Sequence, residues 1–173
     1  MFSLRFPEKE VRAWASKYDY PSKDEPIQVI GAAAAARGHL TRDEFLKIAL
    51  WKSHRPRKRC LRTSDDFVRD ISHSALSSKN SRLKIEVLRL LDGVDWPSAS
   101  VILHFCDKEH WPIIDFRTFW SLGKPNPAGK YSFELWEMYT EYTRALASRA
   151  RVDMRTLDRA LWAYSRQNQP SGA

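Results

Sequence analysis

The stretch Leu90–Phe105, LLDGVDWPSASVILHF, begins as an apolar helix, stops at a glycine and resumes at a proline. Gly93 adopts positive φ freely and Asp95 is a residue type that tolerates it, so both suit a tight turn. Pro97 suits the first turn of a new helix, where a missing N–H costs nothing. The sequence therefore predicts a helix-hairpin-helix over residues 81–106.

The two helices of this hairpin carry apolar faces that indicate how they pack. The first face consists of Leu83, Val87, Leu90 and Leu91, and the second of Ser98, Ala99, Val101, Ile102 and Leu103. The turn between them presents backbone N–H groups at a helix N-terminus, and such groups bind phosphate. The predicted contacts to DNA here are Gly93, Val94, Asp95, Trp96 and Ser98, with Trp96 exposed at the tip. The alternative is an ordinary corner between two helices that binds nothing.

The rest of the chain also favours helices. Helical spacing, caps or breakers mark the segments 6–18, 25–38, 40–53, 62–76, 115–123, 133–150 and 154–167. Thr41 and Glu44 have the spacing of a capping box. No run alternates polar and β-branched residues as a strand does. We therefore expect an all-α fold of about nine helices.

One helical domain is expected over residues 1–167, followed by a disordered tail at 168–173. The Pro- and Gly-rich loop at 124–130 is either a connection inside one body or the seam between two lobes that flank a cleft. Hydrophobic residues make up 43% and aromatic residues 12% of the 173, which is typical of a globular protein.

The chain is strongly basic. It has 29 Lys and Arg against 21 Asp and Glu, a formal net charge of +8, with a pI near 9.7. Such an excess favours a polyanionic partner, and nucleic acid ahead of membrane lipid. The alternative is that the charge only maintains solubility.

Composition also bears on cofactors and location. Cys60 and Cys106 are the only cysteines, too few for a four-thiolate iron–sulfur cluster or a zinc finger. No glycine-rich phosphate loop and no His/Glu metal motif is present, so we expect neither metal nor cofactor. No apolar run is long enough for a membrane span and no signal peptide is recognisable. These features predict a cytoplasmic, nucleoid-associated monomer.

A carboxylate follows the hairpin in "EHWPIIDFRTFWSLG", residues 109–123. Asp115 comes after an apolar approach and opens a short helix, so the first expectation is an N-cap. Arg117, two residues later, either holds a phosphate or pairs with Asp115.

Other candidate contacts to DNA are basic or aromatic. The segment 54–62, HRPRKRCLR, supplies Arg55, Arg57, Lys58 and Arg59 as predicted phosphate contacts, unless it is merely a solvated loop. Trp51, Lys52, Trp120 and Trp162 are the candidates for a base pocket; core packing, or solvent for Lys52, is the alternative for each.

The segment Leu91–Gly123 resembles the helix-hairpin-helix DNA glycosylase superfamily, which includes endonuclease III and bacterial alkyl-adenine glycosylases. The matching residues are "LDGVDWPSASVILHF" and "PIIDFRTFWSLG", with the family's spacing between Gly93 and Asp115. The resemblance implies a two-lobed helical fold with Asp115 as the catalytic carboxylate in the cleft. That residue would stabilise an oxocarbenium-like sugar, or orient water, after the target base is flipped out.

This sequence departs from the family at three places. Asp95 replaces the second glycine of the hairpin, Pro97 stands where bifunctional members carry a lysine nucleophile, and the cysteine cluster of some members is absent. The resemblance therefore implies a monofunctional DNA glycosylase acting on duplex DNA. The resemblance does not identify the excised base, which is a damaged, a mispaired or a phage-modified base. A phage-modified base would imply a role in defence. The alternatives are a non-catalytic DNA-binding module on the same fold and, further off, a protein–protein module.

Overall fold

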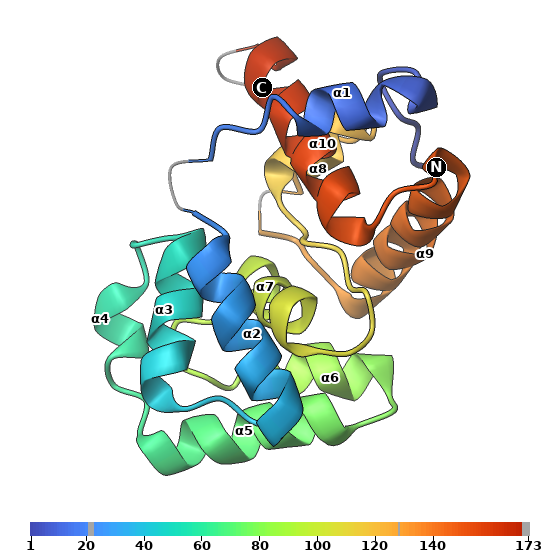
Figure 1. Ribbon diagram of the computed structural model, residues 1–173. Coiled ribbons are helices and arrows are strands. Elements are labelled where there is room, and N and C mark those ends of the chain that lie inside the picture. Colours follow the sequence, from blue (N-terminus) through green and yellow to red (C-terminus); the bar gives the residue numbers. More distant parts are fainter. Residues whose placement is uncertain (21–22, 128, 171–173) are drawn as a thin grey trace. The chain divides into compact units, whose positions relative to one another are not determined.

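The computed structural model describes residues 1–20, 23–127 and 129–170 (Figure 1). Over these residues the chain forms ten α-helices, one 3₁₀ helix and no strand, which confirms the all-α prediction. The elements are η1 Glu8–Glu10, α1 Val11–Ala15, α2 Glu25–Arg37, α3 Arg42–Lys52, α4 Arg57–Cys60, α5 Asp65–Ser77, α6 Ser81–Leu88, α7 Trp96–Cys106, α8 Phe116–Ser121, α9 Phe133–Ala150 and α10 Met154–Asn168.

The chain divides into two compact units. Unit 1 combines Met1–Tyr20 with Pro112–Ala173, and unit 2 is the intervening segment Pro21–Trp111. The loop at 124–130 therefore lies inside unit 1, and the divisions fall after residues 20 and 111.

Unit 2 is organised around α7, which packs against α2, α3 and α6 (Figure 1). Eight of the eleven residues of α7 are buried, including Ala99, Ile102 and Leu103. Gly31 of α2 lies very close to α7, because a Cβ built there would lie 2.1 Å from the carbonyl oxygen of Phe105. Only glycine permits the two backbones to come this close.

The apolar face expected for the first hairpin helix is wrong in part. Leu83 is 50% and Leu90 60% exposed, whereas Ile85 and Leu88 are fully buried. Lys84 is buried as well, and its Nζ lies 2.5 Å from Oδ2 of Asp107 at the end of α7. Because Lys84 is buried in this ion pair, the face of α6 that points inward differs from the face that the leucine spacing predicted.

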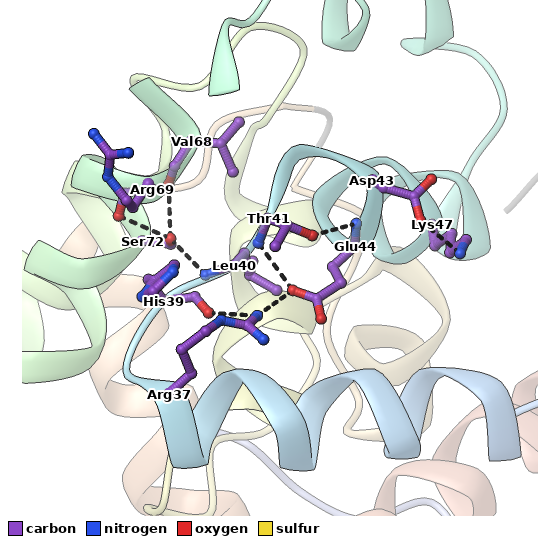
Figure 2. A network of polar contacts seen from close by, with 10 residues as sticks. All are labelled: Arg37, His39, Leu40, Thr41, Asp43, Glu44, Lys47, Val68, Arg69 and Ser72. Atoms are coloured by element: carbon purple, nitrogen blue, oxygen red, sulfur yellow. Dashed lines mark hydrogen bonds and ion pairs between the residues drawn. The ribbon is translucent and has the colours of Figure 1, made fainter. Parts of the chain in front are cut away.

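A polar network fixes the start of α3 (Figure 2). Thr41 and Glu44 form the predicted capping box, and the Glu44 carboxylate also pairs with Arg37. Ser72 of α5 accepts a hydrogen bond from the backbone N–H of Leu40 at 2.9 Å. The network thus joins α2, α3 and α5 through side chains that flank one turn.

Unit 1 packs α10 against both α1 and α8. The N-terminal segment lies beside the end of α8, since the N–H groups of Ser3 and Arg5 donate to the carbonyls of Leu122 and Ser121 at 3.0 and 2.9 Å. Helix α9 has the predicted bounds, whereas the predicted helix at 6–18 is only η1 and α1 and ends at Ala15.

The C-terminal expectation is also corrected in part. Helix α10 continues to Asn168, so the predicted tail begins within a helix, and residues 171–173 lie outside the described residues. No helix in the described ranges has the length and apolarity needed to cross a membrane.

Candidate functional site

The hairpin turn has the predicted shape, with one difference at Asp95. Gly93 has a φ of 82°, and the N–H of Val94 donates to the carbonyl of Leu91 at 3.0 Å. Asp95 is extended rather than left-handed, with a φ of −124°, and it is the N-cap of α7. Its Oδ1 accepts the N–H of Trp96 at 2.8 Å. The protein's own carboxylate therefore lies where a phosphate was expected to bind.

Trp96 is 4% exposed, so the expectation of an exposed tryptophan at the hairpin tip is wrong. The guanidinium of Arg89 lies 4.6 Å from the centroid of its ring and 3.5 Å from the Asp95 carboxylate. Val94 and Ser98 are buried too. The hairpin residues offered as DNA contacts are thus mostly interior.

The basic segment lies directly beside this turn. A Cβ built on Gly93 would lie 2.8 Å from Sγ of Cys60 and 3.2 Å from Cβ of Arg59. Cys60 is buried, and burial raises the pKa of its thiol. The predicted phosphate contacts Arg55, Arg57, Lys58 and Arg59 are all exposed. The fold therefore brings together two candidate segments that lie about 35 residues apart in the sequence.

Asp115 lies in unit 1, three residues after the chain leaves unit 2. It is 8% exposed and caps α8, as its sequence position predicts. Its Oδ1 accepts the N–H groups of Arg117 and Thr118 at 2.9 and 3.0 Å. Two N–H donors at a helix N-terminus stabilise a negative charge and fix the direction of the carboxylate.

Two residues that the sequence did not single out support Asp115. The Thr118 hydroxyl donates to the Asp115 carbonyl at 2.9 Å and accepts its N–H at 3.2 Å. Tyr139 of α9 donates its hydroxyl to the carbonyl of Ile113 at 2.8 Å, two residues before Asp115. Burial, followed by the charge of Asp158, raises the pKa of Tyr139 well above its usual value.

Arg117 and Trp162 come together in unit 1. The guanidinium of Arg117 lies 5.0 Å from the ring centroid of Phe116 and 5.6 Å from that of Trp162. Tyr18 and Tyr20 each make an edge contact with Trp162, at 5.3 and 5.4 Å. Trp162 is half-buried and accordingly stays a candidate for contact with a base.

The other aromatic candidates have contacts of a packing kind. Trp120 lies under the Arg5 guanidinium at 4.5 Å and stacks on Tyr164 at 5.8 Å. Trp51 is buried in unit 2 and makes an edge contact with Phe105, as core packing predicts. Lys52 is half-buried at the end of α3.

The remaining candidates among the described residues are metal-ligating and nucleophilic groups. No group of three His, Cys, Asp or Glu residues within the described ranges has the geometry of a metal site. Cys106 is buried and free, and burial raises its pKa to about 12, which makes the thiol a poor nucleophile.

Comparison with known proteins identified no relative. No family model, no curated protein and no solved structure matches the chain.

Proposed function

We propose that this protein is a monofunctional DNA N-glycosylase with the helix-hairpin-helix glycosylase fold, and that Asp115 is its catalytic carboxylate. The observation that carries the proposal is the setting of Asp115. It is buried, its Oδ1 is held by two backbone N–H groups, and it directly follows the passage of the chain from unit 2 to unit 1. The formal net charge of +8 favours a DNA partner, and the exposed basic segment lies beside the hairpin turn at Gly93.

The chemistry requires a fixed negative charge. When the bond between C1′ of the sugar and the base nitrogen breaks, the base leaves with the electron pair and positive charge develops on the sugar. A preoriented carboxylate in a dry setting stabilises that charge more than water does. Water then adds to C1′ and loses a proton, which leaves an abasic site. With Pro97 at the position of the lyase lysine, no Schiff base forms there and strand cleavage does not follow.

The proposed substrate is duplex DNA that contains a damaged or modified base, bound by a monomer at the nucleoid in the cytoplasm. The target base is flipped out of the stack, and Trp162 and Arg117 are the candidate contacts on unit 1. A bulky phage-type base would make the role one of defence rather than repair.

The test compares Asp115→Asn with wild type on DNAs that carry methylated, deaminated, oxidised and phage-type bases. Asparagine keeps the cap acceptor but removes the charge, so base release should fall by about 10²–10³-fold. Alkali-dependent strand cleavage of end-labelled DNA measures the release. The matched control is Asp153→Asn, because Asp153 caps α10 in the same unit and accepts the N–H of Thr156 at 2.6 Å. Wild-type activity in Asp115→Asn would refute the mechanism.

A non-catalytic DNA-binding module is the second candidate. It is favoured by the completeness of the Asp115 cap, which gives this residue a structural role without any reaction. This candidate predicts binding to duplex or damaged DNA that weakens with salt, and no abasic product from any substrate.

A further inference from the structure

The segment around α4 is a firmly held part of unit 2, although its sequence resembles a solvated basic loop. On one side, Arg42 of α3 donates from Nε to the carbonyl of Thr63 at 2.8 Å and from Nη2 to that of Leu61 at 2.7 Å. On the other side, Cys60 and Arg59 lie against Gly93 of the hairpin turn. The helix is thereby tied to two neighbours in unit 2.

The orientation of α4 follows from helical periodicity. Pro56 and Cys60 are four residues apart, so they share one face, and both are buried. Arg57 and Lys58 fall on the remaining circumference and are exposed. The apolar face thus holds α4 on the hairpin while the basic face stays in solvent.

The cations on this face differ from several cations elsewhere in unit 2 that form ion pairs. Lys47 lies 2.6 Å from Asp43, and Arg69 lies 3.0 Å from Asp66 (Figure 2 shows the first pair). By contrast, no side chain of Arg55, Arg57, Lys58 or Arg59 forms an ion pair within the described part of the chain. Asp92 is the acidic residue whose charge acts on Cys60 at this turn. Four cations without an ion pair, against the two carboxylates of Asp92 and Asp95 at the turn, leave a local positive excess.

The hairpin turn is a poorer candidate for phosphate binding than α4, because one of its N–H groups already binds a carboxylate. The Asp95 carboxylate accepts the first N–H of α7, and a second anion at that place would be repelled. Arg89 offsets part of this charge at 3.5 Å.

From these observations, which rest on the proposed DNA substrate, we propose that α4 with Arg55 is the element that binds the phosphate backbone of DNA. The hairpin supports α4 through the contact at Gly93. The N-terminus of α7, the second helix of the hairpin, is capped by Asp95 and is closed to phosphate. The recognised chemistry is the regularly spaced phosphate of a duplex, bound through side-chain charge rather than through hairpin amides.

The test measures binding of a short fluorescent DNA duplex by anisotropy at several salt concentrations, with the full chain. Arg57→Gln/Lys58→Gln should weaken binding at least tenfold at low salt. The slope of log K against log salt should fall by about 0.9 for each lost phosphate contact. The matched control, Lys47→Gln/Arg69→Gln, removes the same charge from the same unit and should change the affinity less than twofold. Asp95→Asn keeps the cap acceptor and should tighten binding severalfold.

The outcomes separate this inference from the proposed enzyme activity. An equal loss in both double variants, or a loss on Asp95→Asn, would overturn the role of α4, and so would wild-type protein that does not bind DNA at low salt. Base release by wild type, with unchanged binding by Arg57→Gln/Lys58→Gln, would retain the glycosylase and reject the inference. Selective loss of binding without any base release would retain the inference and reject the glycosylase.

Discussion

The hydroxyl group of Tyr139 holds the segment that carries Asp115. It donates to the carbonyl of Ile113, two residues before the carboxylate, at 2.8 Å. The ring itself stacks on Phe119 at 5.4 Å with an angle of 11°. Removing only the oxygen would therefore leave the packing in place and release the segment.

Tyr139→Phe should lower stability and the proposed activity together. The buried carbonyl of Ile113 loses its donor, which costs about 1–3 kcal/mol in the free energy of unfolding. A shifted carboxylate should also reduce kcat for base release at least about tenfold with little change in KM. Urea unfolding and single-turnover kinetics measure the two effects.

Tyr164→Phe is the control for this variant. Its hydroxyl donates to the carbonyl of Arg5 at 3.1 Å in the same unit, a hydrogen bond that does not involve the segment from Ile113 to Thr118. Equal effects of the two variants on kcat would assign Tyr139 a general structural role only.

Between elements, the contact of α4 with the hairpin turn depends on the absence of a side chain at Gly93. Gly93→Ala should destabilise the protein for two reasons. The left-handed φ of 82° costs alanine about 1–2 kcal/mol in the free energy of unfolding. The overlap of its Cβ with Cys60 costs about 1–3 kcal/mol more. Chemical denaturation measures the sum.

Gly129→Ala is the control that measures the free-energy cost of the left-handed backbone without any overlap of the added Cβ. Gly129 has a φ of 81° and no atom within 4 Å of a built Cβ. The difference between the two variants reports the contact of α4 with the hairpin, and no difference would show that this contact contributes nothing.

Elements with local signals could be predicted from the sequence, whereas faces set by distant partners could not. Helix α9 has its predicted bounds and α3 its predicted capping box, because caps and spacing act within a few residues. Leucine spacing gave the wrong face for α6, because the buried ion pair of Lys84 involves Asp107, 23 residues away.

The candidate site shows the same division. The cap position of Asp115 and the turn at Gly93 follow from local sequence and were predicted. The burial of Trp96 under Arg89 and the bond from Tyr139 to Ile113 were not, because they join groups whose proximity depends on packing. A buried tyrosine on a helix carries no sequence signal that distinguishes its hydroxyl partner.

At the level of the whole chain, unit 2 is continuous and unit 1 is assembled from both ends. The fragment 23–111 contains α2 to α7 and their shared core, so it should fold alone. It should keep helical circular dichroism and a cooperative urea transition, and should bind DNA through α4 without releasing bases.

The fragment 112–170 should behave differently. It lacks α1, the partner of α10, and lacks the apolar side chains of Phe6 and Val11, which are buried in the full chain. It should unfold without cooperativity unless the peptide 1–20 is added, and circular dichroism of the mixture tests this. Cooperative folding of 112–170 alone would show that α1 is dispensable.

The packing of α1 against α10 also determines the order in which the two units can fold during synthesis. During synthesis α1 leaves the ribosome before unit 2, but α10 is made about 140 residues after α1, which takes on the order of ten seconds at typical rates. Unit 2 can fold in that interval. Phe6 and Val11 remain exposed to water or bound to a chaperone until α10 is made. The nascent protein should therefore fold unit 2, to which DNA binding is proposed, before unit 1, which holds Asp115. A ribosome stalled late in the message would then display the proposed DNA binding without the proposed base release.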